Sequence, residues 1–159
     1  MKFAAAAVLA SFALVPASAQ IVRQANPAGY SQVGSLTVPA GMRLTFVSGQ
    51  VATALDPRKP ANSIDGFGDT KTQTISALHA VEGKLKEQGL GLQDVVKINV
   101  YLVGDPKLGG RMDFKGFLSG YSQFFGTPDQ PNKVVRTTVQ VTGLANPGFL
   151  VEVEATAAK

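Results

Sequence analysis

One arginine and two glutamates interrupt an otherwise apolar stretch near the end of the chain, VVRTTVQVTGLANPGFLVEVEATA at residues 134–157. The guanidinium of Arg136 could hold a planar carboxylate through two parallel N–H bonds, provided that the surroundings exclude water. The same arginine could instead form a solvated ion pair with Glu152 or Glu154 on a sheet surface, worth under about 1 kcal/mol. The stretch therefore carries either a carboxylate-binding site or an ordinary surface ion pair.

Strand alternation predicts where these charges project. Apolar and polar residues alternate over 133–144 and again over 149–157, as expected for two half-buried strands. If the apolar sets of both strands face one core, the polar sets share the opposite, uncovered face of the sheet: Arg136, Thr138, Glu152 and Glu154. Pattern alone favours the surface ion pair, because charge on an open sheet face is common. A binding site would require a second subunit to cover that face.

Other residues with reactive side chains have weaker contexts. His79 lies one step off the apolar stripe of a predicted helix, which indicates a surface or boundary histidine. Ser48 has no G-x-S-x-G context, so nothing indicates a nucleophile. The segment 66–69, Gly-Phe-Gly-Asp, lacks the spacing of a dinucleotide-binding motif and is interpreted as loop. A single histidine and no cysteine argue against a transition-metal site.

The charge distribution disfavours nucleic acid as a partner. The formal net charge is +4 at pH 7, and the basic residues are scattered along the chain. The densest groups are Arg58-Lys59 and the pair Lys84 and Lys86, and no basic run alternates with aromatic residues. Such a pattern lacks the continuous basic patch that nucleic-acid-binding domains present.

The first nineteen residues resemble an export signal. Lys2 precedes an uncharged apolar run, and Ala17-Ser18-Ala19 forms an A-x-A cleavage site. The run is shorter than the roughly 20 residues that span a bilayer. We therefore expect a signal peptide at 1–19, one domain at 20–159, and a periplasmic or secreted protein without stable membrane association after cleavage. The absence of cysteine leaves no lipid-anchoring site and no disulfide.

The remaining pattern predicts two helices and five strands. Residues 36–51 read as two strands joined by a turn at 39–41, and Thr70 with Gln73 fits a capping box at a helix start. Apolar residues then recur at helical spacing: Ile75, Leu78, Val81 and Leu85. A strand at 94–103 follows, with a wholly apolar face made of Val96, Ile98, Val100 and Leu102. An aromatic-rich helix from about Phe114 and the two closing strands complete the order. The order predicts an α+β fold, a single mixed sheet with both helices on one face. The half-apolar uncovered face indicates a partner subunit.

The motifs along the chain resemble those of the RidA/YjgF family of reactive-intermediate deaminases. The similarity covers about residues 30–157, and the motifs occur in the family's order. Each motif alone is weak, whereas the combination is specific to the family. The motifs are FVSGQVA at 46–52, QTISALHAVEGKLKEQGLGLQDVVKINVYL at 73–102, FFG at 124–126, RTTVQV from residue 136, and VEVEATA at 151–157.

This resemblance implies a chorismate-mutase-like homotrimer, in which the sheets pack into a central barrel and the sites lie between subunits. It also implies cofactor-independent hydrolysis of enamines and imines, such as 2-aminoacrylate and its imine tautomer, to a 2-keto acid and ammonia. In this sequence Arg136 would bind the substrate carboxylate, and Glu152 would position water and move protons. Ser48 and Gly49 would line the pocket together with Tyr30, which would come from a neighbouring subunit.

The sequence also departs from the family pattern. Thr138 stands where the family has a cysteine and is expected in the substrate pocket, and Leu118 aligns near the family's helix asparagine. Val134-Val135 replaces the usual proline before the arginine. Two other functions fit the same residues: a non-catalytic protein that binds small carboxylates, and a periplasmic holdase chaperone. A ribonuclease role is disfavoured by the export signal and the scattered charge.

Overall fold

This computed structural model describes residues 20–27 and 29–159, so the expected signal peptide at 1–19 lies outside the described residues. Within those ranges, no helix has both the length and the apolar character needed to cross a membrane. Short 3-10 turns occur at Ile64–Gly66, Leu92–Asp94 and Pro106–Leu108. The strands and helices are β1 (Val22–Ala25), β2 (Val33–Thr37), β3 (Leu44–Val51), α1 (Thr70–Glu87), β4 (Val95–Val103), α2 (Phe114–Tyr121), β5 (Val135–Val141) and β6 (Val151–Ala158).

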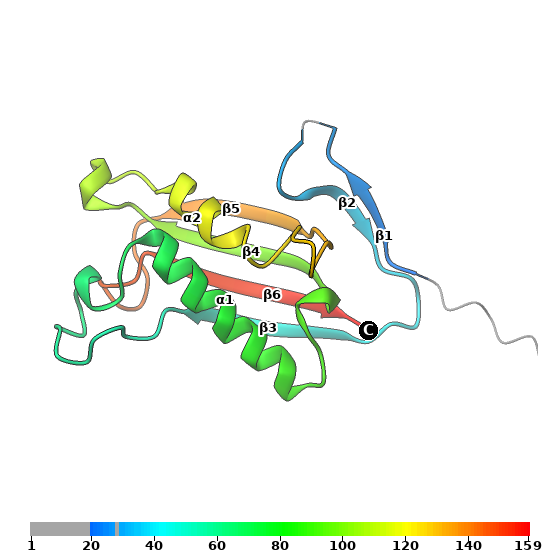
Figure 1. The fold of residues 1–159 in the computed structure, drawn as a ribbon, viewed down its shortest axis with the longest axis horizontal. Helices are drawn as coiled ribbons and strands as arrows, with labels where there is room; N and C mark the ends of the chain where they lie inside the picture. Colours follow the sequence, from blue (N-terminus) through cyan, green and yellow to red (C-terminus); the bar gives the residue numbers. More distant parts are fainter. Residues whose placement is uncertain (1–19, 28) are drawn as a thin grey trace, which may run out of the picture.

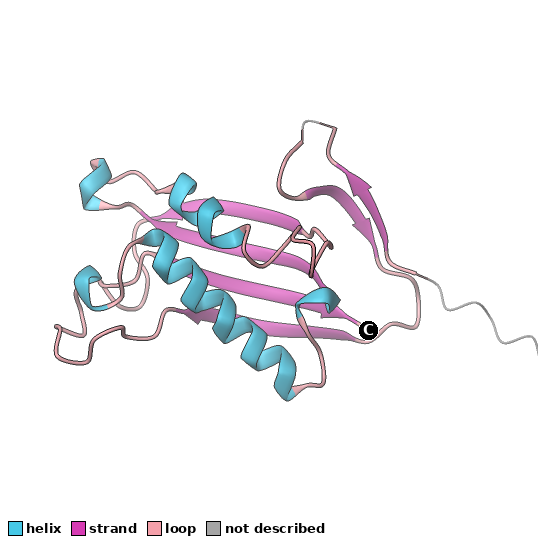
Figure 2. Ribbon diagram, in the orientation of Figure 1, coloured by secondary structure: helices cyan, strands magenta, loops and turns pink. Residues whose placement is uncertain are grey.

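The main sheet has four strands in the order β3-β6-β4-β5. β6 pairs antiparallel with both β3 and β4, whereas β4 and β5 are parallel. Both helices lie over the same face of this sheet (Figures 1 and 2). The predicted α+β fold, a mixed sheet with two helices on one face, is confirmed. β5 and β6 follow each other in sequence but are separated in the sheet by β4.

The predicted hairpin at residues 36–51 is wrong. β2 pairs antiparallel with β1, with Val22 opposite Thr37, and these two strands form a separate small sheet. The connection at residues 38–43 is longer than a tight hairpin loop, and it contains Gly41 at a φ of +89°. The β1–β2 hairpin stands beside the β5 edge of the main sheet (Figure 1). A backbone bond of 3.2 Å from the Val33 N–H to the Val134 carbonyl fixes this contact.

The core lies between the helices and the covered face of the sheet. The apolar stripe predicted for α1 is confirmed, because Leu78, Val81 and Leu85 are fully buried, while Ile75 is partly buried. Successive helix-facing side chains of β4 and β6 pack against them and are buried as well: Ile98, Val100, Leu102, Val151, Val153 and Ala155. The predicted apolar face of β4 is therefore the core face. The alternate residues are exposed or half-buried from Lys97 onward, whereas Val95 at the start of the strand is fully buried.

The start of α1 differs from the predicted capping box. Thr70 is already helical, and the cap is Asp69, whose carboxylate accepts a 2.8 Å bond from the Thr72 N–H. Gln73 is fully buried and turns inward: its Nε2 donates to the carbonyls of Gly68 and Gly148, both at 2.9 Å. Its Oε1 accepts from the Leu150 N–H at 2.8 Å. One amide therefore ties the start of α1 to the segment that leads into β6.

Replacing Gln73 with leucine should destabilise the fold. The Gln73→Leu variant leaves the buried Leu150 N–H and the Gly148 carbonyl without partners, so the free energy of unfolding should fall by about 3 kcal/mol. Chemical denaturation measures this change. Gln88→Leu, at an exposed position at the end of α1, should change it by less than about 0.5 kcal/mol. Equal effects in the two variants would contradict a bridging role for the buried amide.

Candidate functional site

The four polar residues of the closing strands do not share a face, which corrects the prediction from alternation. In the parallel pairing of β4 and β5, Ile98 lies opposite Arg136 and Val100 opposite Thr138. Residues paired across strands project to the same side of a sheet. Arg136 and Thr138 therefore lie on the helix-covered face, beside buried residues of β4. Glu152 and Glu154 lie on the uncovered face.

The error arises from the position of β5 at the edge of the sheet. Its valines face the uncovered side, where Val139 is 41% exposed. Its polar residues Arg136, Thr138 and Gln140 face the other side: the aromatic rings of α2 pack against Arg136, Thr138 is half-buried, and Gln140 is exposed. Alternation correctly separates the two sets of β5 residues but does not determine which set faces the helices. The predicted surface ion pair is also absent: in the described part of the chain, no carboxylate lies within ion-pair distance of Arg136.

Arg136 is a half-buried cation packed against the rings of α2. Its guanidinium carbon lies 4.7 Å from the ring centroid of Tyr121, 5.1 Å from that of Phe117 and 5.9 Å from that of Phe114. Burial lowers the pKa of Arg136, and the nearby Tyr121 partly offsets that shift. Burial raises the pKa of Tyr121 to about 12, so the tyrosine stays neutral beside the cation. The guanidinium is therefore a positive charge packed against aromatic rings, without a paired anion among the described residues.

Neutral acceptors occupy the donor edge of this guanidinium. Nη1 of Arg136 donates to Ser31 Oγ at 3.1 Å, and Nη2 donates to Gln32 Oε1 at 3.0 Å. Both acceptors come from the segment that enters β2. Two oxygens on the two terminal nitrogens reproduce the arrangement by which arginine holds a carboxylate. We expect an incoming carboxylate to displace at least the Gln32 amide from this edge.

A small cavity opens beside the guanidinium. Its volume is about 250 Å³, and its walls come from β5, the segment before α2 and the entry to β2. Thr138 contributes a buried Oγ1 that has no hydrogen-bond partner among the described residues. An unpaired buried hydroxyl costs free energy unless a ligand or water satisfies it. The lining residues, hereafter the arginine cluster, are Gln32, Met112, Phe114, Arg136 and Thr138.

Glu152 belongs to a second cluster, on the uncovered face. It lies opposite Val51 of β3 and Tyr101 of β4, next to an irregularity in the pairing of β3 between Val47 and Gln50. Any side chain at Gly49 would collide with the Glu152 carboxylate, so glycine allows that carboxylate to lie against the β3 backbone. In the described ranges this carboxylate has no ion-pair partner. Its oxygens can therefore accept hydrogen bonds from a water or a ligand without first breaking an ion pair.

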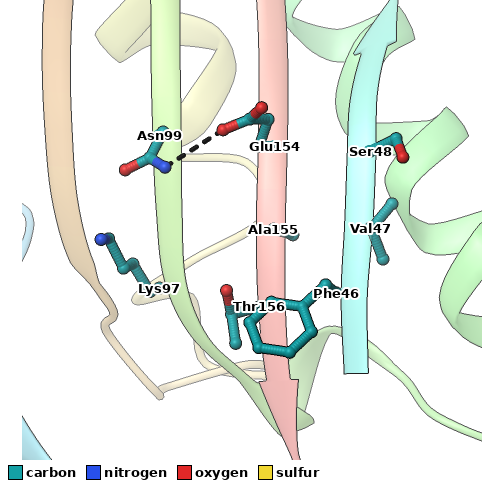
Figure 3. A pocket seen from close by; sticks show the side chains of 8 residues that line it. All are labelled: Phe46, Val47, Ser48, Lys97, Asn99, Glu154, Ala155 and Thr156. Carbon is teal, nitrogen blue, oxygen red and sulfur yellow. Dashed lines mark hydrogen bonds between the residues drawn. The ribbon is translucent and has the colours of Figure 1, made fainter. Parts of the chain in front are cut away.

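Glu154, whose role the sequence left open, is held by its neighbours on the same face. Its Oε2 accepts from Asn99 Nδ2 at 3.1 Å (Figure 3). The same oxygen accepts from the Tyr101 hydroxyl at 3.0 Å. The hydrogen bond to Glu154 raises the pKa of Tyr101. This carboxylate lines a cavity of about 390 Å³ formed by Phe46, Val47, Ser48, Lys97, Asn99, Glu154, Ala155 and Thr156. We call the residues Ser48, Gly49, Glu152 and Glu154 the glutamate cluster.

The predicted site residues thus fall into two groups on opposite faces of the sheet. Arg136 and Thr138 meet in the arginine cluster. Gly49 lies against Glu152, whereas Ser48 lines the larger cavity with Glu154 and its side chain points away from that carboxylate (Figure 3). Tyr30 is 55% exposed and precedes the serine that contacts Arg136. No sequence pattern indicated Ser31 or Gln32, because their contact with Arg136 depends on where the β1–β2 hairpin lies.

Two further groups carry no second site. His79 is a surface residue as predicted, with its ring 4.9 Å from Phe124 and Nδ1 3.5 Å from a Glu82 carboxylate oxygen. Within the residues that the structure describes, no set of three or more histidine, aspartate or glutamate side chains is arranged to hold a metal ion.

Comparison with known proteins identifies similar chains over most of the length. A family model described as Endoribonuclease L-PSP matches residues 22–159. A RutC family protein of Pyrococcus abyssi is 34% identical over 114 residues, which cover 72% of this chain and 77% of that protein.

Solved structures have the same fold. Escherichia coli TdcF with bound serine has a TM-score of 0.56 at 27% identity and covers 77% of this chain and 84% of its own. The Rid family protein YyfB of Yersinia pestis, described as of unknown function, has a TM-score of 0.64 at 22% identity and covers 86% and 98%. The second likeness supports the fold alone, whereas the first combines the fold with appreciable sequence identity.

A carboxylate introduced at position 32 should pair with Arg136. In Gln32→Glu the folded-state pKa of the new carboxyl should fall below its usual value of about 4.3. The stability it adds is then present at neutral pH and is lost as pH falls through the folded pKa. The difference in unfolding free energy between variant and wild type should be about 1 kcal/mol larger at pH 7 than at pH 3.

Denaturation at several pH values measures this difference. Gln123→Glu, at an exposed position after α2, provides the matched charge change and should show no comparable pH dependence. A pH profile of Gln32→Glu that follows the Gln123→Glu profile would mean that residue 32 does not contact the guanidinium in solution.

Proposed function

This chain belongs to the RidA/YjgF family, and we propose that it hydrolyses small 2-imino acids and their enamine tautomers to 2-keto acids and ammonia. The observation that supports this most directly is the guanidinium of Arg136, which packs against aromatic rings beside a small cavity and has no ion-pair partner among the described residues. Such a group binds one planar carboxylate with defined orientation. A 2-imino acid carries its reactive carbon directly next to that carboxylate.

The reaction needs little beyond orientation and a proton carrier. Arg136 binds the substrate carboxylate in place of the Gln32 amide. The electrophilic carbon of the imine, whose nitrogen is protonated, then lies at a fixed distance from the guanidinium. Glu152 accepts a proton from water as the water oxygen bonds to that carbon, which gives a carbinolamine. Glu152 then returns this proton to the carbinolamine nitrogen, the C–N bond breaks, and the hydroxyl proton leaves with the nitrogen, so that a 2-keto acid and ammonium are released. One iminium acid and one water therefore give one keto acid and one ammonium ion, without a cofactor.

We further propose that two copies of the chain complete each site. Arg136 and Glu152 lie on opposite faces of one sheet, so one copy cannot bring its own glutamate to a carboxylate held by its own arginine. A homotrimer whose uncovered faces pack into a central barrel would bring the glutamate cluster of one copy to the arginine cluster of the next. The exposed apolar side chains on the uncovered face support such packing, with Phe46 75% exposed and Val139 41% exposed.

The bound ligand in a related structure supports a small amino or imino acid as the substrate. The TdcF structure contains serine, a 2-amino acid whose carboxylate has the same position relative to its nitrogen as in a 2-imino acid. The signal-like sequence at 1–19 supports action in the periplasm or outside the cell. There the imino acid would arise outside the cytoplasm, from an exported enzyme or from the medium.

Removing either proposed catalytic group should strongly reduce turnover. Arg136→Ala should lower kcat/KM for a 2-imino acid by about 100-fold or more, because the substrate loses its anchor and orientation. Glu152→Gln should lower kcat by a similar factor while keto acids still stabilise the protein. Ammonia release, in a mixture with an amino-acid oxidase that generates the imino acid, measures the rate. Arg58→Ala and Glu87→Gln, both at exposed positions, provide matched controls with unchanged rates.

Mixed oligomers test the sharing of sites between copies. If Arg136 and Glu152 of one site come from different copies, oligomers refolded from equal amounts of Arg136→Ala and Glu152→Gln will contain intact sites. Random assembly predicts about a quarter of wild-type activity, because half of the copies supply each intact partner. Activity no higher than that of either variant alone would contradict the shared site. Keto-acid binding without turnover in the wild type would instead indicate a non-catalytic carboxylate-binding protein.

A further inference from the structure

We propose that Met112 and Phe114 form a subsite for the substrate side chain and that Gln140 is its positioning residue. The preferred substrates are then 2-imino acids with an apolar side chain of several carbons, instead of the smallest members of the class. This inference rests on the proposed function, because it concerns the same cavity. It is supported by the residues that line the cavity and by the hydrogen bonds that hold its walls in place.

Three helix-facing residues of β5 contribute different chemical groups to the cavity and its wall. Arg136 carries the charge, Thr138 offers the unpartnered hydroxyl, and Gln140 continues the same face, opposite Leu102 of β4. The Gln140 side chain binds backbone only: its Oε1 accepts from the Met112 N–H at 2.8 Å, and its Nε2 donates to the Gly110 carbonyl at 2.9 Å. This amide therefore sets the distance between β5 and the segment that carries Met112.

The wall opposite β5 is fixed at both ends. The Asp105 N–H donates to the Arg111 carbonyl at 3.0 Å, which closes the loop before Met112. Any side chain at Gly104 would collide with the Gly110 carbonyl, so the two backbone segments pass in close contact. Phe114 is the first residue of α2, which Asp113 caps by accepting a 2.8 Å bond from the Gly116 N–H. Met112 and Phe114 are thus presented by an ordered backbone.

The polar groups of the cavity are already matched to the reacting end of the substrate. Arg136 takes the carboxylate, while Gln32 and Thr138 can accept from or donate to the imine nitrogen and its water. The side chains of Met112 and Phe114 offer a thioether and a ring face, which contact apolar groups well. A charged or hydroxyl-bearing side chain placed there would lose hydrogen bonds to water without replacement.

The volume of the cavity further limits the size of the substrate side chain. Its volume of about 250 Å³ lies below the roughly 300–1,000 Å³ of pockets for drug-sized ligands. An acid with a short aliphatic chain is compatible with such a volume. A flexible methionine in the wall can adapt to linear or branched chains. The geometry therefore points to 2-imino acids of the kind that oxidation of aliphatic amino acids produces.

Binding and turnover of matched probes test the subsite. The probes are pyruvate, 4-methyl-2-oxopentanoate and 2-oxoglutarate for binding by calorimetry, and the imino acids formed from alanine and leucine for turnover. We expect 4-methyl-2-oxopentanoate to bind at least about tenfold tighter than pyruvate, and 2-oxoglutarate to bind no tighter than pyruvate. The leucine-derived imino acid should show a correspondingly higher kcat/KM than the alanine-derived one.

Variants assign the preference to the proposed residues. Met112→Ser should reduce the preference several-fold while pyruvate affinity changes little. Phe114→Ser should also reduce the preference, and it should weaken pyruvate binding as well, because it removes a ring beside Arg136. Leu55→Ser, at an exposed loop position, should leave the preference unchanged. Gln140→Ala should weaken binding of 4-methyl-2-oxopentanoate but not of pyruvate, which general unfolding cannot mimic. Thermal denaturation of each variant confirms that it is folded.

The outcomes separate this inference from the proposed function. Equal affinity for pyruvate and 4-methyl-2-oxopentanoate, or a preference that survives both serine variants, would overturn the subsite even if imino acids are hydrolysed. Selective binding of the longer keto acid without hydrolysis of its imino acid would support the subsite and refute the deaminase. Absence of binding by every keto acid would refute both.

Discussion

The packing of the Arg136 guanidinium against aromatic rings is the interaction on which the rest of the candidate site depends. A half-buried cation loses hydration, and its surroundings must offset that loss. Here the rings of α2 contribute cation–π contacts, and two neutral oxygens from the entry to β2 accept its hydrogen bonds. The same contacts explain why α2 is rich in aromatic residues and why the β1–β2 hairpin lies beside β5. The charge therefore organises a helix, an edge strand and a hairpin that are remote in sequence.

The spacing of apolar residues correctly predicted the buried faces of α1 and β4. The stripe of α1 and the apolar face of β4 are each repeated several times, so one exceptional residue does not hide them, and both bury as expected. β5 is different, because an edge strand exposes valines on one side and covers polar residues on the other. Alternation in β5 divides its residues into two sets but does not show which set faces the helices. The direction depends on the pairing with β4 and on the rings of α2, which are contacts between distant segments.

The same reasoning explains which glutamine contacts could not be predicted from the sequence. Gln73 was expected to reach back to its own helix start, but its amide bridges to carbonyl and N–H groups some 75 residues away. Gln32 and Gln140 contact Arg136 and the Met112 backbone in a similar long-range manner. A glutamine has no preferred local partner strong enough to reveal such a role, whereas arginine and glutamate attract attention by charge alone. Family resemblance supplied Arg136 and Glu152 but not the amides that position their surroundings.

The division of the site between two faces has a physical consequence for catalysis. A carboxylate close to Arg136 within one chain would form an ion pair with it and would compete with the substrate. Keeping Glu152 on the opposite face prevents this pairing, and the neutral Gln32 amide satisfies the guanidinium without a charge that a substrate must expel. If a neighbouring copy supplies the glutamate, the two charges meet only across a cleft that a substrate can enter between them. Separation within the chain and proximity within the assembly would then leave the arginine free to bind and the glutamate free to move protons.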